Sequence, residues 1–216
     1  MPVPLPRGLS PPVRLALAYA PGVARAAVAA VFALDQRLGL VMRSVKEPLL
    51  GQVRLAWWRE RLAELPQTPA GEPLLAALAA AGLTAGDTLP LVDGWEAALL
   101  AGDPVQAATA LAAARGAAFA ALAVVLGHDG YADQAEAAGA RWALADLACH
   151  ASDPELRSAA YQQLQTARGK RHRFPRHLRS LAVLDGWATA IAFKPLDQLH
   201  PNWKDLVVIV RIGLFG

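Results

Sequence analysis

The sequence predicts an all-α protein, a single-domain bundle of about seven to nine helices. Alanine and leucine dominate the 55% of residues that are hydrophobic, whereas aromatic residues make up only 6%, and this balance favours helices over strands. Glycines and prolines divide the 216-residue chain into segments of helical length. A chain of this size can bury one sizeable core. We therefore expect one helical domain over residues 13–216 behind a proline-rich arm over residues 1–12.

Prolines and N-cap residues predict where helices begin in the first half of the chain. Pro21 and Pro48 suit the first turn of a helix, where a missing N–H costs nothing. Asp87 or Thr88 is expected to cap a later helix in which Trp95 lies on the apolar face. By residue number, the expected helices are 11–20, 21–42, 48–65, 74–81 and one that begins near 87–88.

Two Asp-Pro pairs indicate helix starts in the second half of the chain. Asp103-Pro104 and Asp153-Pro154 each combine an N-cap side chain with a first-turn proline. The expected helices are 103–126, 132–150, 153–168 and 180–193, followed by an apolar tail.

Composition and charge argue against several classes of function. The single cysteine, Cys149, excludes an intramolecular disulfide and a cysteine metal cluster, so we expect a reducing compartment. A net charge of +3 and a pI near 9.3 describe a mildly basic surface, which argues against a nucleic-acid partner. Prolines near the N-terminus argue against a signal peptide. A cytoplasmic protein is expected.

Two apolar segments raise the question of whether the chain spans or contacts a membrane. The segment 107–127 contains Arg115 near its middle, and an arginine at the centre of a bilayer is costly. We expect a buried core helix there and no transmembrane segment. The tail VVIVRIGLFG is short and interrupted by Arg211, which leaves core packing or a peripheral membrane contact.

Motifs of common enzyme chemistry are missing from the sequence. No GxSxG, P-loop or GxGxxG occurs, and the five histidines have no metal-ligand spacing. Cys149 and His150 are neighbours and would point about 100° apart on a helix. Asp35 is followed four residues later by Gly39, and Asp146 by His150. Because helical magnesium sites need facing carboxylates, the sequence predicts no metal site.

The segment from Glu47 to Leu65 contains the least ordinary residues, two adjacent tryptophans among three arginines. The apolar residues expected to face the core, from their helical spacing, are Leu50, Val53 and Trp57. A neighbouring face would present Arg54, Trp58 and Arg61. An indole between guanidiniums can flank an anionic or flat apolar group. The alternative is a half-buried helix with arginines along its rim.

The segment from Leu15 to Leu65 resembles the N-terminal third of the squalene/phytoene synthase family, particularly a bacterial and mitochondrial branch with the helix pattern EPxxGQxRLxWWR. The later stretches PLVDGWEAAL, AGARWALADLACH and FPRHLRSLAVL match the family in order. The resemblance implies the isoprenoid synthase fold, with helices around a central cavity in which two prenyl diphosphates are condensed. Candidate residues for binding a ligand or diphosphate are Arg54, Trp58, Arg59, Arg61 and Asp146. Candidate cavity-lining residues are Tyr19, Asp35, Gly39 and Trp142.

Departures from the family pattern concern its two aspartate-rich motifs. The motif Arg-x-x-Asp-Asp-x-x-Asp falls on Gln36, Gly39, Leu40 and Arg43. The motif Asn-x-x-Arg-Asp-x-x-x-Asp falls on Asp146, Cys149, His150 and Pro154. Only Asp146 could still be a ligand. Without paired carboxylates, no bound Mg²⁺ can neutralise a leaving diphosphate.

Two hypotheses about function follow. The first is a non-catalytic family member, a pseudoenzyme resembling the respiratory complex I assembly-factor branch. It would bind a protein partner, a lipid or a prenyl chain without a cofactor, and could sit at the inner membrane face. The second is an active prenyl transferase of isoprenoid biosynthesis that holds diphosphate with Arg54, Arg59, Arg61 and the basic stretch 168–180. Mg²⁺ enters only under the second hypothesis. The basic stretch could equally be a solvated loop or contact an anionic membrane.

Overall fold

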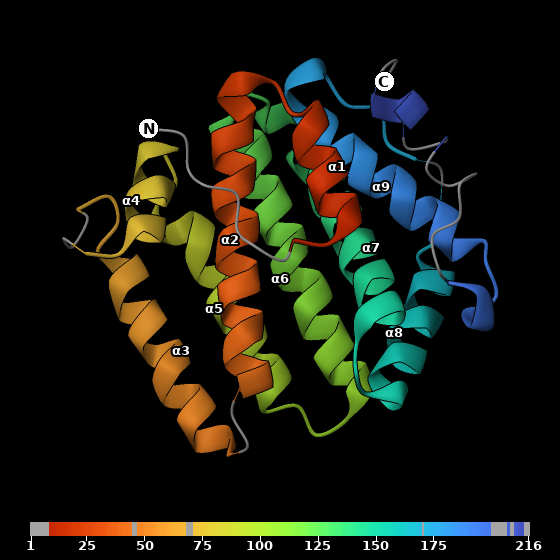
Figure 1. The fold of residues 1–216 in the computed structure, drawn as a ribbon, viewed down its shortest axis with the longest axis horizontal. Coiled ribbons are helices and arrows are strands. Elements are labelled where there is room, and N and C mark those ends of the chain that lie inside the picture. The colour runs from red at the N-terminus through yellow and green to blue at the C-terminus, as the bar shows by residue number, and fades with distance from the viewer. Residues whose placement is uncertain are drawn as a thin grey trace.

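The computed structural model is all-α, as the composition predicted (Figure 1). It describes residues 9–44, 47–67, 71–169, 171–199, 207 and 210–213, and this part of the chain contains no strand. The bounded α-helices are α1 (Pro11–Tyr19), α2 (Gly22–Ser44), α3 (Pro48–Ala63), α4 (Pro73–Ala80), α5 (Ala85–Leu99), α6 (Pro104–Val125), α7 (Ala132–His150), α8 (Pro154–Thr166) and α9 (Arg179–Ala192). Residues 207 and 210–213 are also helical, so the described helices slightly exceed the expected seven to nine.

Helix starts agree with the Asp-Pro predictions. Asp103 accepts a hydrogen bond from the backbone N–H of Gln106 at 2.9 Å, and Asp153 caps α8 in the same way. The prediction for α5 was wrong, because its N-cap is Thr84. Asp87 instead lies at the third helical position and accepts a hydrogen bond from the backbone N–H of Thr84 at 2.8 Å. This reciprocal capping box places the N-cap three residues before Asp87 and four before Thr88, the two predicted caps.

Helix α6 lies at the centre of the bundle, between α5 and α7 (Figure 1). Glycines allow the three helices to approach closely. A Cβ at Gly94 of α5 would lie 2.1 Å from Cβ of Ala114, and one at Gly139 of α7 would lie 2.6 Å from the carbonyl oxygen of Arg115. By length and hydropathy α6 could span a bilayer, but 56% of its most apolar stretch is buried by other helices.

Helix α3 packs with the opposite face from the one predicted. Leu50, Val53 and Trp57 are 51%, 61% and 43% exposed, so the expectation that they face the core was wrong. The buried stripe is Gly51, Leu55, Trp58 and Leu62. Apolar residues follow both faces of α3, so periodicity alone could not select one. The buried stripe runs along most of the helix. Packing of α3 against α5 covers this face and leaves the other in solvent.

Candidate functional site

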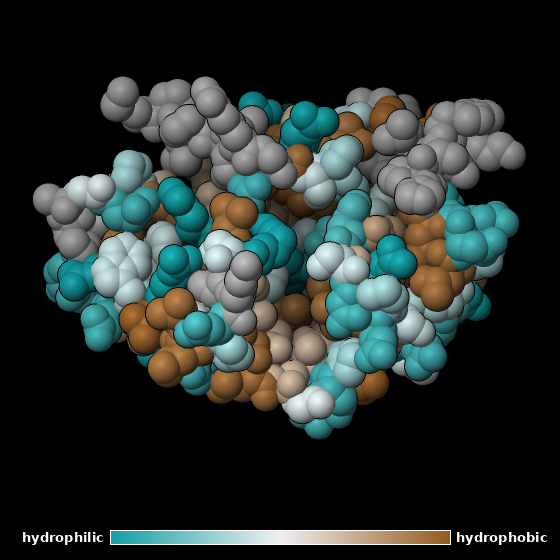
Figure 2. Space-filling view, turned by 60° about the horizontal axis from the view of Figure 1, so that its bottom comes forward, coloured by the Kyte–Doolittle hydropathy of each residue, from teal (hydrophilic) through white to brown (hydrophobic). Residues whose placement is uncertain are grey.

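A pocket of about 220 Å³ opens among the N-terminal end of α1 and the helices α2, α5, α6 and α7. A hollow is visible near the middle of the face in Figure 2, which views the end of the bundle that is lowest in Figure 1. The pocket is lined by Leu9, Ser10, Val13, Phe32, Asp35, Gln36, Gly39, Arg43, Trp95, Arg115, Trp142, Asp146 and His150. Apolar and polar side chains therefore share its wall.

Arg115 of α6 is the buried charge around which the pocket is built. It is only 6% exposed. Its Nε lies 3.1 Å from Oδ1 of Asp35 and its Nη2 lies 2.9 Å from Oδ2, a two-pronged contact with α2. Its Nη1 donates to Oδ2 of Asp146 on α7 at 3.2 Å. One guanidinium thus binds carboxylates from two helices. Burial would lower the pKa of Arg115, but the two carboxylates outweigh it and raise that pKa.

Two tryptophans enclose this guanidinium. Its Cζ lies 5.5 Å from the ring centroid of Trp95 and 4.9 Å from that of Trp142, both within the range of cation–π attraction. Nε1 of Trp95 donates to Oδ1 of Asp35 at 2.9 Å. Nε1 of Trp142 is buried and has no hydrogen-bond partner within the described part of the chain. The site therefore leaves one buried donor unsatisfied, which is unfavourable.

His150 lies at the rim of the pocket, one helical turn beyond Asp146. Its Nδ1 is 3.1 Å from both Oδ1 and the carbonyl oxygen of Asp146, so Nδ1 donates. This hydrogen bond raises the pKa of His150 against the opposing effect of burial. Burial alone would raise the pKa of Asp146, but the hydrogen bond from His150 and the charge of Arg115 outweigh it and lower that pKa. Asp146 is accordingly ionised, and it lies between the guanidinium of Arg115 and the imidazole of His150.

The structure brings together four of the residues selected from the sequence. Asp35, Gly39, Trp142 and Asp146 all line the pocket. Tyr19 does not line it and packs against Gly213 instead.

The arginines of α3 and Trp58 lie outside the pocket. Arg59 forms ion pairs with Asp93 and Glu96 of α5. Arg61 pairs at 3.3 Å with Glu64, the residue that follows the end of α3. Nη1 of Arg54 donates to Oγ of Ser44 at 2.8 Å. Trp58 is buried in the core. These residues do not form one common binding face.

Sequence reasoning missed Arg115 and Trp95 as site residues. Arg115 entered only as an interruption of an apolar segment, yet a lone arginine in a buried helix needs a carboxylate partner. The need for a carboxylate partner could have identified Arg115 as a site residue from the sequence. Gln36, Gly39 and Arg43, which occupy motif positions in the resemblance, also line the pocket.

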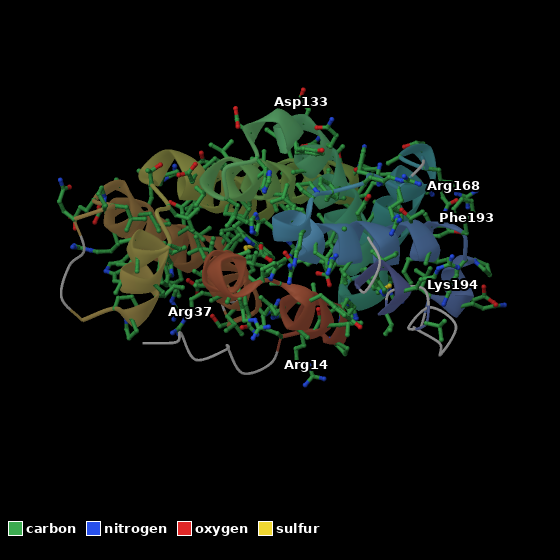
Figure 3. The ribbon with its side chains drawn as sticks, turned by 90° about the horizontal axis from the view of Figure 1, so that it is seen from above. Arg14, Arg37, Asp133, Arg168, Phe193 and Lys194 are labelled. Atoms are coloured by element: carbon green, nitrogen blue, oxygen red, sulfur yellow. The ribbon has the colours of Figure 1, made fainter. Side chains whose placement is uncertain are left out.

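A second buried ion pair fixes part of the basic stretch 168–180. Nε of Arg141 donates to Oδ1 of the fully buried Asp185 at 3.0 Å. The backbone N–H of His172 donates to Oδ2 of the same carboxylate at 2.9 Å. Arg168 donates to the carbonyl oxygen of Ala192 at 2.9 Å and lies over the ring of Phe193 (Figure 3). This stretch is therefore tied to α7 and α9 at several points.

Comparison with family models, curated proteins and solved structures found no match to this chain. Function is therefore inferred from the chemistry of the pocket. Within the described ranges, no three His, Cys, Asp or Glu side chains come together as metal ligands. Burial, with the charge of Asp146, raises the pKa of Cys149 to about 12, so this thiol stays protonated and is a poor nucleophile.

Proposed function

We propose that this protein is a non-catalytic binding protein derived from the squalene/phytoene synthase family, with the isoprenoid synthase type of fold. The observation that carries the proposal is the position of Arg115. Asp35 and Asp146 face the pocket from α2 and α7, the helices on which the resemblance locates the metal-binding aspartates. Both carboxylates are bound to Arg115. A guanidinium thus supplies the positive charge that magnesium would supply in an active synthase.

The charges around the two carboxylates oppose metal binding. Mg²⁺ needs carboxylate oxygens that are free to enter its coordination shell. Here the oxygens of Asp35 accept from Arg115 and Trp95, and those of Asp146 accept from Arg115 and His150. Entry of a divalent cation would also meet the repulsion of a buried arginine.

The pocket has the chemistry of a site for a small amphiphile. Its volume of about 220 Å³ is below the roughly 300–1,000 Å³ of pockets that enclose a drug-sized ligand. Leu9, Val13 and Phe32 provide an apolar wall, while Arg43 and His150 contribute a guanidinium and an imidazole to the same lining. A pocket of this volume holds only part of a lipid or prenyl chain, and we infer that the anionic end of the chain enters it and meets Arg43 and His150. A role in the assembly of a respiratory complex would use the same binding activity.

The experiment compares turnover with binding. Purified protein is incubated with farnesyl diphosphate and Mg²⁺, diphosphate release is followed, and binding of the same compound is measured by calorimetry. We expect no diphosphate release. We expect binding that is weakened by Arg43→Ala and by His150→Ala, while Arg54→Ala, an exposed arginine outside the pocket, is the matched control.

Turnover that is lost in Asp146→Ala would establish the alternative, an active prenyl transferase, and overturn the proposal. Binding that is equally unchanged in all three variants would remove the pocket as the binding site.

A further inference from the structure

Two histidines from distant parts of the chain meet at the surface of the bundle. His128 lies between α6 and the short 3₁₀ helix η1 (Asp129–Tyr131), and His177 is the middle residue of another 3₁₀ helix, η2 (Arg176–Leu178). Nε2 of His128 lies 3.2 Å from Nδ1 of His177, although the two residues are 49 positions apart in the sequence. His177 is exposed and His128 is half-buried. Solvent and small solutes can therefore reach both imidazoles.

Tight backbone turns hold the two imidazoles in place. The carbonyl oxygen of His128 accepts a hydrogen bond from the N–H of Tyr131 at 2.9 Å. The turn that contains His177 is closed by the N–H of Leu178, which donates to the carbonyl oxygen of Pro175 at 2.9 Å. The ring of Tyr131 also packs edge-on against the ring of His128, with 6.3 Å between the centroids. Because the fold already brings the ring nitrogens together, a ligand that binds both of them loses little entropy in ordering them.

The separation of the two nitrogens matches that of two ligands on one metal ion. Zinc binds histidine nitrogens at about 2.0–2.1 Å in a tetrahedral arrangement, which places two such nitrogens about 3.3–3.4 Å apart. The observed 3.2 Å is only slightly shorter. Without metal, one imidazole donates a hydrogen bond to the other. When a metal ion replaces this hydrogen bond, the hydrogen moves to the other nitrogen of the same ring, and both rings stay neutral.

We propose that His128 and His177 form a binding site for a divalent transition-metal ion such as zinc. Imidazole nitrogens suit zinc, nickel and copper, whereas Mg²⁺ and Ca²⁺ prefer oxygen ligands. Asp129 and Arg176, which adjoin the two histidines in the sequence, are both exposed and carry opposite charges, so together they neither attract nor repel a cation. The ion joins the turn after α6 to η2 and fixes the basic stretch 168–180 at a further point. This inference does not depend on the pocket.

Two protein ligands make this an exchangeable site. A structural zinc site has four protein ligands and is closed to solvent, whereas here water occupies the remaining coordination positions. We therefore expect reversible binding of one ion that depends on both imidazoles.

Calorimetric titration of the full-length, untagged protein with zinc chloride tests the proposal. We expect one zinc ion per protein. His128→Gln and His177→Gln are each expected to weaken binding at least tenfold, because each removes one of the two nitrogens. Arg176→Gln makes the same replacement at the residue next to His177, and this matched control should bind zinc as the unmodified protein does. Circular dichroism shows whether each variant is folded.

Two further measurements identify the ligands. Zinc at about a hundred times its dissociation constant should raise the folding equilibrium constant about a hundredfold, because the ion joins two segments that are adjacent only in the folded chain. This gain, measured by urea denaturation, should be lost in both histidine variants. Cu²⁺ bound to the unmodified protein should show electron paramagnetic resonance coupling to two nitrogens, and coupling to one nitrogen in either histidine variant.

Two results would overturn the proposal. One is the absence of zinc binding by the unmodified protein. The other is zinc binding of equal strength in His128→Gln, His177→Gln and Arg176→Gln, which would place an adventitious ion elsewhere on the chain. Neither result would affect the proposal for the pocket, which is tested with a different ligand and different variants.

Discussion

Replacing Arg115 with methionine tests the central ion pairs of the pocket. The guanidinium and Asp35 are 6% and 7% exposed, so the substitution leaves the carboxylate of Asp35 buried without its cation. Asp146 keeps a hydrogen bond from His150. Removal of one partner from a buried ion pair typically costs about 3–5 kcal/mol. For a protein of this size we expect the melting temperature to fall by about 10 °C.

Urea denaturation followed by circular dichroism measures the loss. Arg59→Met is the matched control, because Arg59 also pairs with two carboxylates, but at the surface, where about 1 kcal/mol or less is expected. Adding Asp35→Asn to Arg115→Met should recover part of the loss, since the amide carries no charge and its oxygen can still accept from Trp95. The reasoning is refuted if Arg115→Met costs no more than Arg59→Met, or if the added Asp35→Asn makes the protein less stable.

Three further predictions concern packing, titration and the second buried pair. Gly94→Ala should cost at least about 2 kcal/mol in urea denaturation, because the new Cβ would meet Ala114 at 2.1 Å, whereas Gly130→Ala, with open space around it, should change stability little. His150 has a pKa in the folded protein that is raised above its ordinary 6.5, so its contribution to stability is complete below pH 6.5 and is lost as the pH rises through the folded-state pKa. His150→Asn should therefore lower the free energy of unfolding more at about pH 6 than at about pH 9. Equal losses at the two pH values would contradict this. Asp185→Asn should lower the melting temperature by an amount similar to Arg115→Met, because the fully buried carboxylate is the partner of Arg141, and a loss as small as that of Arg59→Met would exclude the role.

The candidate site was predictable only in part. Asp35, Gly39, Trp142 and Asp146 could be selected from sequence because they lie on apolar helices or at positions that the resemblance marks. Their common partner could not be identified, because Arg115 is 80 residues from Asp35 along the chain. No local pattern connects residues so far apart.

The sequence by itself determined that the chain is helical and where several of its helices begin. Proline at the first turn and aspartate at the N-cap act within a few residues, so the starts of α6 and α8 followed directly from Asp103-Pro104 and Asp153-Pro154. The tertiary structure decided which face of each helix is buried. In α3 both faces are apolar, and packing against α5 buries one face and leaves Val53 and Trp57 in solvent. Burial depends on the surface that a neighbouring helix offers, and one helix's own sequence does not contain that information.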